Sequence, residues 1–143
     1  HIYRNPVYVY LSTYKFFSEL FPSVNLQKID YKLLHELIIY NYREMYKDYY
    51  DQKHLIPKKN LIEVKFEDFK IDTLSYLEKI HKNFDLKLSK ELLSKYINYL
   101  DSQKSHKMNT YKIDKYILDE IKKEFSNSFN KMKYDIPKNL EIN

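Results

Sequence analysis

The fold of this chain is decided by the stretch His1-Ile2-Tyr3-Arg4-Asn5-Pro6-Val7-Tyr8-Val9-Tyr10-Leu11-Ser12-Thr13-Tyr14. It reads as the end of a buried strand, a short turn and the start of a helix. Pro6 suits the first helical turn, because the first N–H groups of a helix have no intrahelical partner. Arg4 stands where the strand ends, and an arginine beside a helix N-terminus forms a site for an anion such as phosphate. The alternative on these local features is a solvated arginine.

The composition predicts a single globular domain over residues 1–143. Hydrophobic residues make up 43% of the chain and charged residues 31%, which is ordinary for a folded domain. The chain holds 16 tyrosines and no glycine, a bias that AT-rich coding explains. The same bias enriches lysine, so the net charge of +5 is a weak pointer to a polyanionic partner. The lack of glycine excludes a glycine-rich phosphate loop from this chain.

Residue types also exclude several other sites and segments. The chain has no cysteine and no zinc-ligand spacing among its five histidines, so neither a disulfide nor a metal site is expected. No apolar run reaches the ~18 residues that mark a transmembrane helix. The chain starts without methionine in what reads as mid-strand, and we expect it to be part of a longer protein. The cytoplasm is the favoured compartment, and the Golgi is the alternative if the parent protein carries an upstream anchor.

Apolar residues at helical spacing predict five helices. These helices are expected at 7–20, 26–52, 72–83, 89–100 and 114–129. Pro22 and Ser23 are expected to close the first of them. Asp72, Ser89 and Asp114 are the expected N-caps of the last three, because their side-chain oxygens can accept hydrogen bonds from the first N–H groups.

Two short strands complete the prediction. The first ends at Arg4, and the second is expected at 61–66, with Phe66 as its last residue. Because helices separate the two strands, we expect them to pair in parallel with a right-handed crossover. Residues beyond Pro137 are expected to form a loose tail or a truncated link. The predicted fold class is therefore α/β and helix-rich, with about two parallel strands and five helices.

Four stretches, in this order, resemble the sulfotransferases that use 3′-phosphoadenosine 5′-phosphosulfate (PAPS), most of all their bacterial and protozoan branch. The stretches are His1-Ile2-Tyr3-Arg4-Asn5-Pro6 through Ser12, Tyr42-Arg43-Glu44-Met45-Tyr46 through Pro57, Val64-Lys65-Phe66-Glu67-Asp68-Phe69, and 102–111. The resemblance implies the P-loop-NTPase-like sulfotransferase fold. Residues 1–143 would be the C-terminal part of that domain, without its N-terminal strands and its phosphosulfate loop.

By this resemblance, six residues belong to the cofactor site: Arg4, Ser12, Phe66, Lys104, Lys107 and Asn109. Arg4 and Ser12 would hold the 3′-phosphate, and the three residues of the late loop would close over it. Phe66 would lie near the adenine. The alternatives are a solvated loop for the lysines and an ordinary core position for Phe66. The paired acids that follow Phe66 are interpreted as structural, because carboxylates at a strand end can bind backbone N–H groups.

The implied reaction is transfer of a sulfuryl group from PAPS to a hydroxyl or amine acceptor, with adenosine 3′,5′-bisphosphate as product. The acceptor is unidentified, no catalytic residue is assigned, and no histidine is at the family's base position. This part of the domain would not turn over alone. The alternatives to this enzyme are two non-enzymatic hypotheses. One is a basic helical domain that binds nucleic acid or another polyanion, although acidic residues are interspersed along every predicted helix. The other is a helical interaction module.

Overall fold

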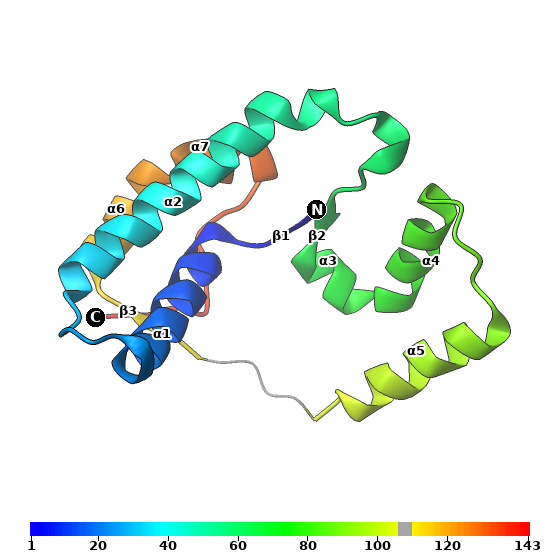
Figure 1. Ribbon diagram of the computed structural model, residues 1–143, viewed down its shortest axis with the longest axis horizontal. Coiled ribbons are helices and arrows are strands. Elements are labelled where there is room, and N and C mark those ends of the chain that lie inside the picture. The colour runs from blue at the N-terminus through cyan, green and yellow to red at the C-terminus, as the bar shows by residue number, and fades with distance from the viewer. Residues whose placement is uncertain (106–109) are drawn as a thin grey trace. The chain divides into compact units, whose positions relative to one another are not determined.

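A computed structural model of the chain describes residues 1–105 and 110–143 (Figure 1). The described residues form two compact units. Unit 1 comprises residues 1–3 and 55–105, and unit 2 comprises residues 4–54 and 110–143. The predicted site residues Lys107 and Asn109 lie outside the described residues. Arg4 and Ser12 belong to unit 2, whereas Phe66 and Lys104 belong to unit 1.

The helix-rich α/β class is confirmed, with more elements than the sequence predicted. The α-helices of the described residues are α1 (Pro6–Val24), α2 (Tyr31–Gln52), α3 (Phe66–Ile71), α4 (Thr73–Asn83), α5 (Lys90–Ser102), α6 (Lys115–Glu124) and α7 (Ser126–Met132). Two 3-10 turns, Lys53–Leu55 and Lys58–Asn60, follow α2. The strands are β1 (Ile2–Tyr3), β2 (Val64–Lys65), β3 (Lys112–Ile113) and β4 (Glu141–Ile142). The predicted helix at 114–129 is divided at Phe125 into α6 and α7.

The predicted parallel strand pair is present in unit 1. Strand β1 pairs with β2 in parallel, with Ile2 opposite Val64. The second strand is shorter than the expected 61–66, and Phe66 is the first residue of α3 rather than the last residue of a strand. The two acidic residues after Phe66 explain this difference, since carboxylates in the first turn interact favourably with the helix dipole.

A second parallel pair, which the sequence did not predict, lies in unit 2. Strand β4 pairs with β3, with Ile142 opposite Ile113. The expectation of a loose tail beyond Pro137 was therefore wrong. The backbone N–H of Asn143 donates to the Ile113 carbonyl at 3.1 Å, and the Lys115 N–H donates to the Asn143 carbonyl at 3.2 Å. These bonds tie the C-terminal residues to the start of α6.

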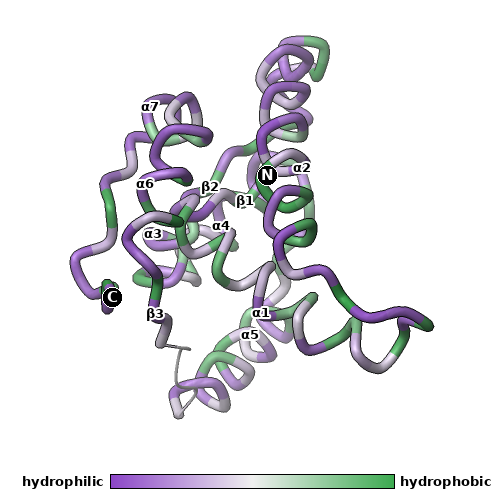
Figure 2. Tube along the Cα trace, turned by 90° about the vertical axis from the view of Figure 1, so that its left-hand side faces the viewer, coloured by the Kyte–Doolittle hydropathy of each residue, from purple (hydrophilic) through white to green (hydrophobic). Residues whose placement is uncertain are grey.

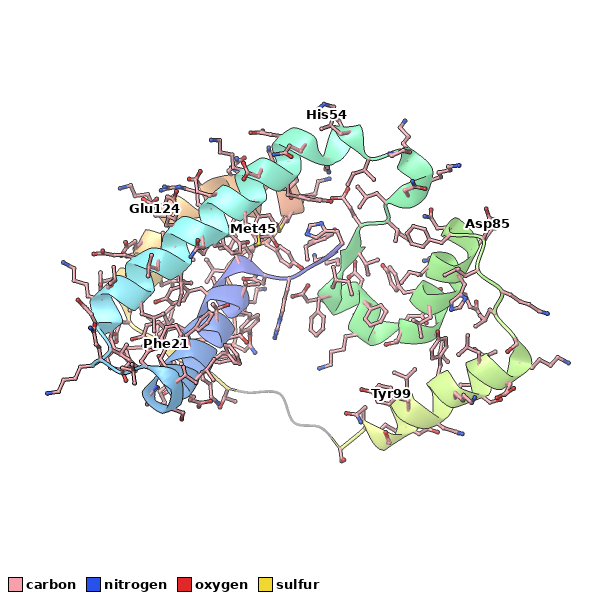
Figure 3. The ribbon with its side chains drawn as sticks, in the orientation of Figure 1. Phe21, Met45, His54, Asp85, Tyr99 and Glu124 are labelled. Carbon is pink, nitrogen blue, oxygen red and sulfur yellow. The ribbon has the colours of Figure 1, made fainter. Side chains whose placement is uncertain are left out.

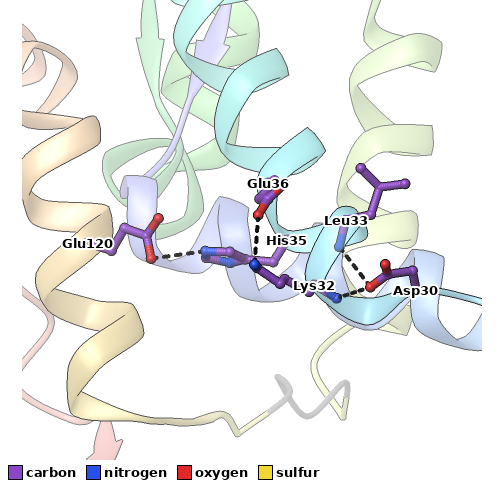
Figure 4. Close-up of polar contacts among 6 residues, drawn as sticks. All are labelled: Asp30, Lys32, Leu33, His35, Glu36 and Glu120. Carbon is purple, nitrogen blue, oxygen red and sulfur yellow. Dashed lines mark hydrogen bonds and ion pairs between the residues drawn. The ribbon is translucent and has the colours of Figure 1, made fainter.

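The first two helices differ from the prediction at one end each. Helix α1 continues through Pro22 to Val24, because a proline in the last turn removes one hydrogen bond without ending the helix. Helix α2 begins at Tyr31 rather than at residue 26. The Asp30 carboxylate sets this start by accepting hydrogen bonds from the N–H groups of Lys32 and Leu33 at 2.9 and 3.1 Å (Figure 4).

The core of unit 2 lies where α1, α2 and α6 meet. Helix α2 runs alongside α6 and α7 in Figure 1. The most deeply buried apolar side chains of the unit come from α1, from α6 and from the residue after α6: Val7, Tyr10, Leu118, Ile121 and Phe125. The ring of Tyr42, on α2, packs 4.0 Å from that of Phe125, centroid to centroid. Burial of these side chains from water is the main stabilisation of the unit.

Helices α3, α4 and α5 of unit 1 are amphipathic, and none of their residues is fully buried. Hydrophobic and hydrophilic residues alternate along α4 and α5 in Figure 2. Two predicted caps are confirmed. Asp72 accepts from the Ser75 N–H at 3.2 Å, and Ser89 accepts from the Leu92 N–H at 3.2 Å. Asp114 is at the N-cap position of α6, but its side chain makes no capping bond.

The side chain of Asn5 determines where α1 begins. Its Oδ1 accepts a hydrogen bond from the Val7 N–H at 3.0 Å, and its Nδ2 donates to the Asp135 carbonyl at 2.8 Å. Asn5 is 5% exposed, and Pro6 follows it at the first helical position. One buried amide therefore caps the helix and holds the segment after α7.

Replacing Asn5 with alanine should lower the free energy of unfolding by about 2 kcal/mol, because it removes a cap and the hydrogen bond that Asn5 donates to the Asp135 carbonyl. Asn5→Asp keeps the capping oxygen and loses the donor to Asp135, so its effect should lie between wild type and Asn5→Ala. Urea denaturation monitored by circular dichroism measures both values. Equal stabilities of Asn5→Ala and wild type would contradict the assigned role.

Candidate functional site

Three of the residues on and just before α1 lie on one face. Arg4, Tyr8 and Ser12 are spaced four residues apart, and side chains four apart on a helix are neighbours. The guanidinium carbon of Arg4 lies 5.2 Å from the centroid of the Tyr8 ring, within cation–π range. Ser12 follows one turn later and is half-buried. The structure thus places both predicted phosphate-binding residues of unit 2 on the face that contains Tyr8. We call the surface formed by Arg4, Tyr8 and Ser12 the Arg4 face.

Two other segments of unit 2 contact Tyr8. Its hydroxyl donates to Oδ1 of Asn139 at 2.6 Å, and its ring lies 6.3 Å from that of Tyr111. Tyr111 immediately precedes β3, and Asn139 lies just before β4. Sequence reasoning missed both Tyr8 and Asn139. The spacing Arg4–Tyr8–Ser12 was a usable signal for Tyr8, whereas no local pattern marks Asn139.

Phe66 borders an apolar hollow within unit 1. The hollow has a volume of about 310 Å³ and is formed by α3, α4 and α5. It is lined by Phe66, Phe69, Lys70, Thr73, Leu77, Tyr96, Tyr99 and Leu100. Figure 3 shows Tyr99 on α5. Two polar groups of the wall are engaged within the unit: the Thr73 hydroxyl donates to the Phe69 carbonyl at 2.8 Å, and the Tyr96 hydroxyl lies 3.1 Å from His81 Nε2.

Lys104 is an exposed residue two positions after the end of α5. Its ammonium forms an ion pair with Asp101 at 2.7 Å. This contact neutralises part of the loop's positive charge, so Lys104 alone is a weak anion ligand. Its phosphate-binding role, and those of Lys107 and Asn109, remain predictions.

The two arginines of the chain have different surroundings. Arg43 bonds Glu44 Oε1 at 3.1 Å through Nε and Glu124 Oε2 at 3.0 Å through Nη1. Hydrogen bonds to Glu44 and then Glu124 raise the pKa of Arg43. Glu124 extends from α6 in Figure 3. Arg43 is therefore committed to carboxylates, whereas Arg4 is stacked on a tyrosine.

A buried polar chain links three helices of unit 2. The Tyr10 hydroxyl lies 2.7 Å from Nδ1 of His35, and Nε2 of His35 lies 3.1 Å from Oε2 of Glu120 (Figure 4). Tyr10 and His35 are 2% and 7% exposed. Burial raises the pKa of Tyr10 well above its usual value of 10, and the neighbouring groups Tyr14, Tyr116 and Glu120 add smaller effects in the same direction. These contacts among Tyr10, His35 and Glu120 tie α1 to α2 and α6, so we assign His35 no catalytic role.

Neither a metal-binding cluster nor a membrane-spanning helix is found in the part of the chain that the structure describes. Residues 1–105 and 110–143 contain no cluster of three or more His, Asp or Glu side chains that could hold a metal ion. In the same residues, no helix has the length and apolarity needed to cross a bilayer. Glu67 and Asp68 lie in the first turn of α3, which agrees with their interpretation as structural residues.

The comparisons with known proteins identify the family. A family model described as the sulfotransferase domain matches residues 1–135. Because the match covers nearly the whole chain, the chain belongs to the sulfotransferase domain family. No curated protein matches the chain, and neither does any solved structure. Arg4, Tyr8, Ser12 and Phe66 all lie within the matched region, whereas Asn139 lies beyond it.

The raised pKa of Tyr10 predicts how stability changes at alkaline pH. A tyrosine whose pKa is higher in the folded state stabilises the fold fully below pH 10, and this contribution declines above pH 10 as the unfolded chain ionises. Between pH 8 and 11.5 the loss should be up to about 2 kcal/mol.

Tyr10→Phe removes this dependence together with the hydroxyl contact to His35. The variant should therefore be less stable than wild type at pH 8, and the gap should shrink or reverse at pH 11.5. Urea midpoints at the two pH values test this. A gap that stays constant would show that Tyr10 ionises in the folded protein as it does in the unfolded chain.

Proposed function

We propose that residues 1–143 are the C-terminal part of one sulfotransferase domain that uses PAPS to sulfate a hydroxyl or amine acceptor. Membership of the family supports the transferase class. The observation that carries the choice of donor is the shared face of Arg4, Tyr8 and Ser12. In this proposal PAPS supplies the sulfuryl group, and this chain binds and orients its nucleotide portion.

Arg4 and Ser12 are proposed to hold the 3′-phosphate. A guanidinium offers two parallel N–H donors that match the oxygens of a phosphate, and the serine hydroxyl adds a third donor. The Tyr8 ring supports the guanidinium from one side, so the Arg4 side chain loses little freedom when an anion binds. Arg43 differs from Arg4, because its guanidinium forms ion pairs with the carboxylates of Glu44 and Glu124.

The hollow beside Phe66 is proposed to take the adenine. Aromatic side chains line it from α3 and α5, and flat bases stack on such rings. Its volume of about 310 Å³ lies at the lower end of the range of small-molecule sites. Its wall is mainly apolar, which favours an uncharged base over a phosphate. Phe66 thus takes the role that the sequence resemblance implied.

The late loop is proposed to complete the phosphate site. Tyr111, which lies two positions after Asn109 in the sequence, contacts Tyr8 on the Arg4 face. Lys107 and Asn109 precede Tyr111 in the sequence, and their ammonium and amide groups are donors that suit a phosphate. Lys104, paired with Asp101, is proposed to contribute only to the local potential.

The residues assigned above bind and orient the nucleotide, and none of them is assigned as a catalytic acid or base. We expect residues 1–143 alone to bind the nucleotide without turnover. The acceptor and the catalytic base are not assigned. Cytoplasmic and Golgi locations of the parent protein are both compatible with this proposal.

Arg4→Ala should weaken binding of adenosine 3′,5′-bisphosphate about 10- to 100-fold, since charge-assisted hydrogen bonds contribute roughly 1.5–3 kcal/mol. Isothermal titration calorimetry at fixed ionic strength measures this change. Arg43→Ala is the matched control and should leave affinity unchanged, because that side chain pairs with Glu44 and Glu124. Equal affinities of Arg4→Ala and wild type would contradict the assignment of the phosphate site.

Phe66→Ala should weaken binding of adenosine 3′,5′-bisphosphate and of 5′-AMP by the same factor, because both ligands carry adenine. Loss of one stacking partner should cost about fivefold or more. Phe84→Ala, which truncates a partly exposed phenylalanine of the same unit, is the control. A loss confined to the bisphosphate would show that Phe66 does not contact the base.

A further inference from the structure

The last eleven residues form a strap, defined here as residues 133–143, that leaves α7 and ends at β3. It departs at Lys133, whose φ of 55° turns the backbone sharply after the helix. Tyr134 then donates its N–H to the Phe129 carbonyl at 3.0 Å. At the far end, β4 pairs with β3, and the Lys112 ammonium contacts the Glu141 carboxylate at 2.5 Å. The strap is thus anchored at both ends.

Between these anchors the strap contacts the start of α1 twice. The Asp135 carbonyl accepts from Asn5, and Asn139 Oδ1 accepts from the hydroxyl of Tyr8. The second contact is on the helix face that includes Arg4 and Ser12. Asn139 and β4 lie beyond the residues that the sulfotransferase family model matches. The strap therefore contacts the candidate phosphate site from outside the matched region.

We propose that the strap is a positioning element for Arg4 and that Asn139 acts through Tyr8. This inference rests on the proposed nucleotide function. The Tyr8 ring is fixed by Asn139 at its hydroxyl and by Tyr111 at its side, and it supports the guanidinium of Arg4 at 5.2 Å. Removing Asn139 frees the hydroxyl end of the ring, so the guanidinium loses its fixed support.

The energetic consequence of this geometry concerns affinity for the 3′-phosphate. A binding group that is held in its bound conformation loses less entropy on association than a mobile one. The strap should therefore raise the affinity for a ligand that carries a 3′-phosphate and leave the affinity for the adenosine 5′-phosphate portion unchanged. A role in general stability would affect both ligands alike. The difference between the two ligands therefore distinguishes a strap that positions Arg4 from a strap that only stabilises the fold.

The experiment compares adenosine 3′,5′-bisphosphate and 5′-AMP as ligands of wild type, Asn139→Ala, Tyr8→Phe and the double variant. Each single variant should bind the bisphosphate about three- to tenfold more weakly and 5′-AMP equally well, since one hydrogen bond is lost. The double variant should resemble either single one, because both substitutions remove the same bond. Asn130→Ala, an exposed asparagine of α7, should match wild type for both ligands.

Three outcomes would overturn the inference, and they are distinguishable. If wild type binds neither ligand, the proposed function fails and the inference falls with it. If wild type binds the bisphosphate and the single variants bind it equally well, the inference alone fails. If the variants lose affinity for both ligands by the same factor, Asn139 has a structural role only. Deleting residues 137–143 is a second test and should weaken only the bisphosphate.

Discussion

The position of α1 within unit 2 depends on the two hydrogen bonds of one buried amide. Asn5 caps α1 with its oxygen and holds the Asp135 carbonyl with its nitrogen, so residues 130 positions apart in the sequence are fixed together. These two hydrogen bonds fix the residue at which α1 begins. The first residue of the helix in turn determines on which face the side chains near it lie. Arg4 lies one position before Asn5, and Tyr8 lies three positions after it. The Arg4 face therefore forms only if the helix begins at Pro6, and Pro6 is buried in this position.

Much of the fold could be predicted from local chemistry, and the rest depends on contacts between distant segments. Asp72 and Ser89 cap their helices as predicted, because a cap depends only on the three residues that follow it. The parallel pairing of β1 with β2 followed from the helical connection. The pairing of β3 with β4 was missed, because two-residue strands leave no alternation to detect. Phe66 was misplaced because one aromatic residue fits both a strand end and a helix start.

The candidate site, like the fold, could be predicted only where it depends on neighbouring residues. Arg4 was predicted from its place beside a helix start, and Ser12 came from the resemblance to the family. Their common face then follows from helix geometry, with Tyr8 between them at the same four-residue interval. Asn139 could not be predicted, since its role depends on where the chain after α7 returns. Sequence reasoning thus identified the charged group, whereas the structure was needed to find what orients that group.

The left-handed backbone at Lys133 has a consequence for a chain that contains no glycine. A non-glycine residue in this region costs roughly 1–2 kcal/mol, and Asp85 after α4 incurs the same cost. Most proteins place glycine at such helix ends. In this chain conformational energy is therefore stored at two helix ends. Glycine at position 133 or 85 would release that energy, so the absence of this residue type leaves the protein below the stability that its fold allows.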